Sequence, residues 1–264
     1  LIFGVIVNRS SQALLLMVIK PWFLWPRFKM LAIRNMITFG RSFTLSRLFM
    51  MGSDMAIPLL AGPYLGAETL GFYGVAVTFA MLPLAKSMPV INQTMIPAFV
   101  KFQDNRNSAT YYHGKLLGVV TLVLIPVIIG MGCVAEGLIL TIAGEKWMSS
   151  ILPLQVMCFG MVFRMCTILY TPVMNSMGRV DLYLKVSVLQ FVFIVLLTYS
   201  TMKYGLIELM LSWAFTAFIV MLATLELSKR VINTSFVSFV TILKPAVLAS
   251  SLMAVVIIAI QPLL

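Results

Sequence analysis

Long apolar stretches recur along this chain, and the short segments between them hold most of its basic residues. A helix that crosses a bilayer needs about 20 mainly apolar residues, and in lipid a helix satisfies its own backbone hydrogen bonds. Such stretches lie at 1–19, 36–59, 69–99, 109–134, 148–177, 181–202, 205–228 and 245–262, with 235–243 as a short interfacial lead-in to the last. We therefore predict an all-α, polytopic membrane helix bundle with about eight transmembrane helices.

Basic residues are shared unequally between alternate connections, which predicts the orientation of the helices. One set of connections holds twelve of them: Lys20, Arg27, Lys29, Arg34, Lys101, Arg106, Lys115, Arg179, Lys185, Lys229, Arg230 and Lys244. The alternate set holds Lys146 and Lys203 together with four acidic residues. Because Lys and Arg accumulate in cytoplasmic loops, the first set is assigned to the cytoplasm.

Composition and motifs argue against several other classes. Charged residues make up only 10% of the chain, against about 25% in soluble domains, and no basic, aromatic surface for nucleic acid is expected. The chain lacks HExxH, GxSxG, P-loop and GxGxxG motifs and an acidic metal cluster, so we expect no enzyme, no catalytic residue, no metal and no cofactor. Cys133, Cys158 and Cys166 lack CxxC spacing and are expected to be small core residues, and His113 to be interfacial.

Charged residues inside the predicted helices are the main clue to function. Five are basic and one is acidic: Arg9, Arg41, Arg47, Lys86, Arg164 and Asp54. A cation at the centre of a spanning helix costs about 2.5–3.5 kcal/mol on insertion scales, so such residues usually face a wet interior. We therefore predict a cationic, substrate-binding lumen, formed by Arg47, Lys86, Arg164 and Arg9.

Each of these charges also has a structural interpretation. Arg47 and Asp54 are seven residues apart on one helical stripe, so they could pair through water. Asp54 could instead pair with a cation on another helix, or take part in ion coupling. Arg41 lies close enough to the cytoplasmic end to reach the headgroups. Lys86 and Arg164 are too deep for that, which leaves a lumenal role or an ion pair.

The chemistry of the cations indicates the kind of anion. Guanidinium groups bind phosphate oxygens through two parallel hydrogen bonds, and the Lys ammonium acts on phosphate as a point charge. These contacts strengthen in a low-dielectric cavity. A transporter of cationic drugs would need a lumen of the opposite sign, so a phosphate-bearing substrate is favoured.

Four segments of the chain carry a family pattern. They are DMAIPLLAGPYLGAETLGFYGVAVTFAMLPLAKSMPVINQTMIPAFVKFQDN at 54–105, AGEKWMSSILPLQVM at 143–157, MNSMGRVDLYLK at 174–185, and a YxxGK motif at the start of the helix at 109–134. In this order they resemble the Wzx-type polysaccharide and lipopolysaccharide flippases, in the branch that includes the colanic acid exporter. The resemblance runs from about residue 36 to residue 230 and places the chain in the MOP (MATE-like) superfamily.

The resemblance implies a domain organisation. Members of this superfamily have two six-helix lobes around a central cavity, often with two further helices. Residues 1–35 would then be the last helix of the first lobe and a cytoplasmic inter-lobe linker. Residues 36–230 would be the second-lobe six-helix bundle, and 231–264 an additional C-terminal transmembrane helix. On this expectation the chain is truncated at both ends.

The resemblance also implies a function in the bacterial inner (plasma) membrane. It implies export of an undecaprenyl-pyrophosphate-linked oligosaccharide repeat unit by alternating access, for exopolysaccharide or O-antigen biosynthesis. The expected partners are that lipid-linked glycan, the lipid bilayer and the polysaccharide polymerase machinery. Asp54, Lys86 and Gly178–Arg179 match family positions, whereas Arg47 and Arg164 rest on the electrostatic argument alone.

The glycines of these segments are expected to be structural. Gly66 and Gly71 are interpreted as turn and close-packing residues, and Gly178–Arg179 as a helix cap. Two alternatives for the function stay open. The chain could belong to a related carrier of lipid II or a small molecule, or to a non-transporting membrane component of the same pathway.

Overall fold

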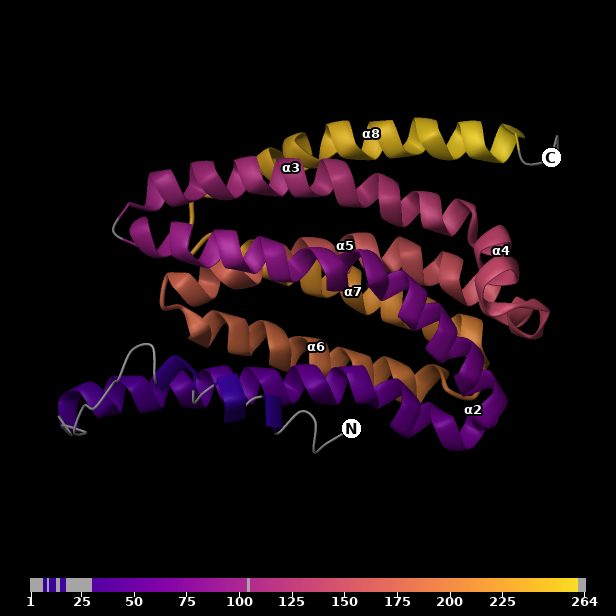
Figure 1. Cartoon of the computed structure of the whole chain (residues 1–264), viewed down its shortest axis with the longest axis horizontal. Helices are drawn as coiled ribbons and strands as arrows, with labels where there is room; N and C mark the ends of the chain where they lie inside the picture. Colours follow the sequence, from indigo (N-terminus) through magenta and orange to yellow (C-terminus); the bar gives the residue numbers. More distant parts are fainter. Residues whose placement is uncertain (1–6, 9, 13–14, 18–29, 104, 261–264) are drawn as a thin grey trace. The chain divides into compact units, whose positions relative to one another are not determined.

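The computed structural model describes residues 7–8, 10–12, 15–17, 30–103 and 105–260. Its long elements are α2 (Met30–Lys101), α3 (Arg106–Cys133), α5 (Ile151–Ser176), α6 (Val180–Thr201), α7 (Leu206–Ser228) and α8 (Phe236–Ile260) (Figure 1). Three short pieces connect α3 to α5: α4 (Ala135–Leu138), the π-helix η1 (Ile139–Ala143) and the 3-10 helix η2 (Glu145–Ser150). The predicted all-α, polytopic class is confirmed.

The chain divides into two units, residues 1–38 and 39–264. In the first unit the described residues are helical. The second unit holds α3 to α8 and most of α2, and it contains every predicted site residue except Arg9. Arg9 lies outside the described residues, so its predicted place in the lumen stays a prediction.

By length and hydropathy, six helices in the described part of the chain can cross a membrane, with α2 counted once. The expected number of eight is not confirmed. The segment 1–19 falls largely outside the described residues. The predicted helices 36–59 and 69–99 both lie within α2, which contains a break at Gly66.

The chain reverses direction at this break. Ser53, before it, and Met81, after it, both line hollows beside Arg164 of α5. In a straight helix that rises 1.5 Å per residue they would be about 40 Å apart. Gly66 has φ 81° and ψ 165°, a backbone conformation that residues with a Cβ rarely adopt. The turn expected of Gly66 is therefore confirmed, and Figure 1 shows α2 folding back there.

Connections predicted to be cytoplasmic meet at one end of the second unit. The Gln103 amide donates to the Ser176 carbonyl, which joins the end of α2 to the end of α5. The Arg106 guanidinium donates to the carbonyl of Lys229, and the Asn233 amide donates to Asn107. The start of α3 thus lies beside the connection from α7 to α8. This shared end agrees with the alternation of basic and non-basic connections in the sequence.

The core of the second unit is built around α5, which packs against α3, α6 and α7. Met157, Met161 and Met165 repeat every four residues on its buried face, and none is more than 1% exposed. Gly160 allows α7 to come close, because an ideal Cβ there would lie 2.6 Å from the Trp213 ring and 3.0 Å from the Cα of Ala214. Small residues at such positions are what bring helices together in membranes.

The outermost helix, α8, packs along α3 (Figure 1). Ile242 lies over Gly114 and Gly118, and Met253 lies over Gly130. The helix already begins at Phe236, with the hydroxyl of Ser235 accepting from the Val237 amide. The stretch 235–243 is therefore mostly the first part of the last helix itself, and the expectation of a separate lead-in is wrong.

Two other local expectations met different outcomes. His113 is fully buried between the rings of Phe99 and Tyr170, so its predicted interfacial position is wrong. The neighbouring tyrosines occupy the exposed face of α3 instead, which is why the local sequence looked interfacial. Cys158 and Cys166 are buried, as expected of small core residues, whereas Cys133 is only partly buried.

Candidate functional site

An ion pair between Arg164 and Asp54 joins α5 to α2. Asp54 lies in the part of α2 before Gly66, here called the first limb; the part after Gly66 is the second limb. Nη2 of Arg164, near the middle of α5, donates to Oδ1 of Asp54 at 3.0 Å. The Arg164 side chain is 11% exposed and the Asp54 side chain 48% exposed, so the pair lies at the edge of the helix packing. Of the two structural alternatives for Asp54, the structure shows the pairing with a cation on another helix.

The guanidinium of Arg164 has further neighbours. Its Cζ lies 6.0 Å from the centre of the Trp213 ring of α7, within the range of a cation–π interaction. Its Nε is buried and has no hydrogen-bond partner among the described residues. A buried donor left in that state costs about 1–3 kcal/mol. Arg164 is therefore held by one ion pair and one cation–π contact, and its Nε–H remains available as a hydrogen-bond donor.

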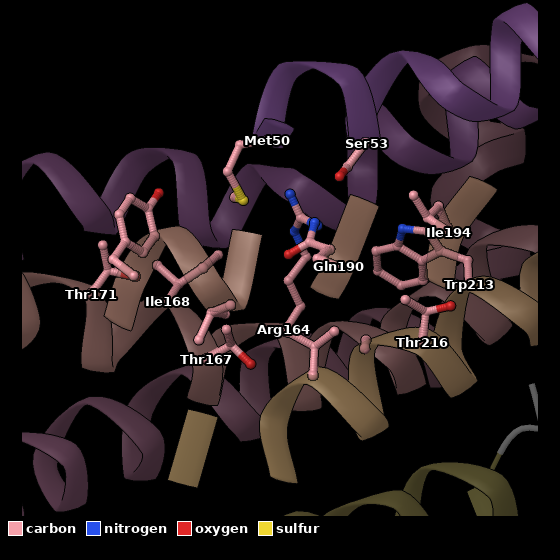
Figure 2. A pocket seen from close by; sticks show the side chains of 14 residues that line it. Met50, Ser53, Arg164, Thr167, Ile168, Thr171, Gln190, Ile194, Trp213 and Thr216 are labelled. Carbon is pink, nitrogen blue, oxygen red and sulfur yellow. The ribbon is translucent and has the colours of Figure 1, made fainter. Parts of the chain in front are cut away.

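A small cavity surrounds this side chain, between α2, α5, α6 and α7. Polar residues from α5, α6 and α7 share its wall with apolar ones, and they include Thr167, Gln190 and Thr216. Figure 2 shows the Arg164 side chain extending from α5 toward α2, where Met50 and Ser53 lie. The cavity measures about 30 Å³, which is room for a water molecule rather than for a sugar phosphate.

A second, larger hollow of about 180 Å³ lies on another side of Arg164. Met81, Leu84, Ala85 and Met88 from the second limb of α2 form one wall, opposite Met161 and Ile168 of α5. Arg164 therefore stands between both limbs of α2, although Asp54 on the first limb is the acid that it contacts. A movement of either limb would change the surroundings of this guanidinium.

The other predicted cations are placed differently. Arg47 is exposed, with its guanidinium 5.4 Å from the Phe43 ring centre, and it lies within electrostatic range of Tyr183 in the cavity wall. Lys86 is exposed on the second limb of α2, and neither it nor Arg47 forms an ion pair with a described residue. The structure thus groups Arg47, Asp54 and Arg164 and leaves Lys86 apart. Their role in substrate binding stays a prediction.

Several residues around Arg164 were not predicted from the sequence. Gln190 and Tyr183 of α6 and Trp213 of α7 line the cavity. A glutamine within the mainly apolar part of α6 was a usable sign for Gln190, because buried amides need partners. Nothing in the sequence marks Trp213, whose position depends on the close approach of α7 to Gly160.

The glycines of the family segments have the structural roles expected of them. Gly178 has φ 71°, and the amides of Gly178 and Arg179 donate to the carbonyls of Asn175 and Met174, which closes the end of α5. Arg179 also makes two hydrogen bonds with Asp181, and they raise the pKa of Arg179 above its ordinary value. Gly71 packs against the Trp147 ring, where an ideal Cβ would lie at 3.3 Å.

Comparison with known proteins adds the family. The chain is 26% identical over 246 residues to the lipopolysaccharide biosynthesis protein WzxC of Escherichia coli K12, which covers 90% of this chain and 49% of that protein. It is 26% identical over 211 residues to a membrane protein of the cps region of Klebsiella pneumoniae, covering 78% of this chain and 43% of that protein. It is 26% identical over 180 residues to the teichuronic acid biosynthesis protein TuaB of Bacillus subtilis 168, covering 67% of this chain and 37% of that protein.

The chain therefore spans less than half the length of these relatives. No solved structure matches it. A sequence model of the polysaccharide biosynthesis protein family matches residues 1–152, which include both limbs of α2, all of α3 and Asp54 of the ion pair. The apolar helices and these relatives together make it a multi-pass protein of the inner membrane. This chain belongs to the polysaccharide biosynthesis protein family, among proteins of the Wzx flippase type.

Proposed function

We propose that this chain forms part of an exporter of lipid-linked oligosaccharides. Its cargo would be an undecaprenyl-pyrophosphate-linked repeat unit, moved across the inner membrane by alternating access for exopolysaccharide or O-antigen biosynthesis. Family membership supports the role in polysaccharide biosynthesis. Two of the relatives are named for lipopolysaccharide and for teichuronic acid biosynthesis, and the third is named as a membrane protein of a cps region.

Unpaired positive charge on membrane-spanning helices is the observation that carries the proposal. Arg47 and Lys86 are exposed and lack a carboxylate partner within the described ranges, and Arg164 has Asp54 alone. Such charges would be costly against lipid, so they favour a water-filled pathway. A pyrophosphate headgroup in that pathway would supply the missing negative charge, through strong hydrogen bonds to guanidinium and ammonium groups.

The proposal includes a division of the chain. Residues 36–230 would form one six-helix lobe, 231–264 an additional helix, and 1–35 the end of the other lobe with its linker. The reversal at Gly66 supports it, because it gives α2 two limbs that each exceed the length of a span. In this proposal Arg47 and Lys86, on different limbs, both face the pathway in at least one state of the transport cycle.

The test uses the full-length protein in vesicles loaded with a fluorescent undecaprenyl-pyrophosphate sugar on one leaflet. Lys86→Ala and Arg47→Ala should each lower the rate of transfer by about tenfold or more, because a hydrogen bond to a charged group contributes about 1.5–3 kcal/mol. Lys203→Ala is the matched control, since Lys203 is exposed between α6 and α7, outside the spans. Expression and membrane insertion are measured for all three variants.

Normal transfer by both variants would refute the role of the cations. Transfer of lipid II or of a small-molecule substrate, in place of the oligosaccharide, would favour the related-carrier alternative. Loss of transfer in Lys203→Ala as well would mean that the assay reports general damage to the protein and not the loss of a particular charge.

A further inference from the structure

A long apolar groove runs between α5, α7 and α8. It encloses about 410 Å³, which falls within the range of about 300–1,000 Å³ seen for ligand sites. Phe163 of α5, Met221 of α7 and Val240 and Val247 of α8 contribute to its wall, and Lys244 is the charged residue in it. The α8 residues of the wall follow a helical stripe, while another face of α8 packs on α3.

The groove continues into a polar hollow at the end that carries the basic connections. This hollow measures about 240 Å³ and shares Leu222 and Phe236 with the groove. Its other lining residues include Glu226 from the end of α7 and Lys229, Thr234 and Ser235 from the connection between α7 and α8. The combined site is therefore amphipathic along its length, with an apolar body and a polar end in which Glu226 and Lys229 balance each other's charge.

Lys244 is the charged residue in the wall of the apolar groove. It is exposed, and it forms no ion pair with a carboxylate of the described residues. It lies eight residues after the first residue of α8, or about 12 Å along the helix, so its stem can cover apolar wall while its ammonium extends toward the interface. Lys229, at the polar end, is already paired with Glu226, which leaves Lys244 as the free positive charge beside the groove.

We propose that this groove binds an anionic phospholipid of the cytoplasmic leaflet. One acyl chain would occupy the apolar body between α7 and α8, and the phosphate would be attracted to Lys244 and contact the polar end. Basic pockets between membrane helices on the cytoplasmic side recognise anionic headgroups in this way, with about fivefold in affinity for each basic residue near the surface. An apolar protein helix in the groove would fill the apolar body but leave Lys244 without a counter-charge.

The experiment measures binding of fluorescent phosphatidylglycerol to the purified full-length protein in detergent, compared with phosphatidylcholine of the same chain length. We expect a preference of about fivefold for phosphatidylglycerol. Lys244→Gln should abolish this preference, because it removes the charge and keeps the stem. Val240→Trp and Leu248→Trp should weaken the binding of both lipids, because each fills the groove from an exposed position.

Two controls match these changes in type and position. Lys185→Gln removes an exposed charge of α6 at the same end of the unit, and Val255→Trp enlarges an exposed residue of α8 away from the groove. Both should bind like the wild type. Unchanged binding by Lys244→Gln, or by both tryptophan variants with normal thermal unfolding, would overturn the proposal. So would displacement of phosphatidylglycerol by undecaprenyl phosphate at lower concentration, which would assign the groove to the cargo lipid instead.

Discussion

The ion pair between Arg164 and Asp54 is expected to couple α5 to α2 by about 1–2 kcal/mol. Two unit charges about 4 Å apart attract by about 4 kcal/mol at an effective dielectric constant of about 20. Asp54 is 48% exposed, which screens this attraction, and the burial of Arg164 adds a desolvation cost. Interhelical polar contacts measured in membranes average about 0.6 kcal/mol and reach about 1.7 kcal/mol, so the expected coupling lies at the upper end of that range.

The two single substitutions should not cost the same. Asp54→Ala leaves a guanidinium that is 11% exposed without its acid, and removal of one partner from a fully buried pair costs about 3–5 kcal/mol. Arg164→Ala leaves an acid that is half exposed, and it also removes the contact with Trp213, worth about 0.5–1 kcal/mol. We therefore expect Asp54→Ala to destabilise the protein more, and the double variant to cost less than the sum of the two.

The assay is a double-mutant cycle on the full-length protein in detergent, with unfolding followed by tryptophan fluorescence. Arg179 and Asp181 supply the control pair, since both are 40% exposed or more and form a similar ion pair within one turn. Exposed pairs of that kind couple by about 0.2–1 kcal/mol. Additive effects of Arg164→Ala and Asp54→Ala, or a coupling no larger than that of the control pair, would refute the reasoning.

Two further predictions concern the core. Gly160→Ala should lower the free energy of unfolding by about 1–3 kcal/mol, since the new Cβ would meet Trp213 and the backbone of Ala214. Gly74→Ala, with open space around it in α2, should be neutral or stabilising; equal losses in chemical denaturation would contradict the packing argument. His113→Phe should stabilise the protein by about 1 kcal/mol or more, because both ring nitrogens of His113 are buried without a good hydrogen bond, although the Leu169 backbone lies near. A lower midpoint of thermal unfolding in His113→Phe would contradict this expectation.

The spans could be predicted from the sequence because the physics that fixes them is local. About 20 apolar residues must form a helix to cross lipid, whatever lies beside them. The turn at Gly66 could also be predicted locally, because this glycine lies between two apolar stretches, where the chain must turn. The ends were harder to place, because the segment before α5 forms the 3-10 helix η2 rather than the first turn of α5.

Partners across helices could not be predicted in the same way. The sequence marks Arg164 and Asp54 as costly charges, but their contact depends on how α5 packs against the first limb of α2. His113 was predicted to be interfacial, but it is buried in the core. Its tyrosine neighbours face outward, while its own side of α3 is covered by Phe99 near the end of α2 and by Tyr170 of α5.

The methionines of α5 have a consequence for movement. Met157, Met161 and Met165 are unbranched, and each has three rotatable bonds and a polarizable sulfur. The same atoms can therefore fill gaps of different shape, so a small shift of α5 against its neighbours need not open an empty space. Branched aliphatic residues at these three positions would hold a single arrangement more firmly, and such rigidity would hinder the alternation between two arrangements that the proposed export requires.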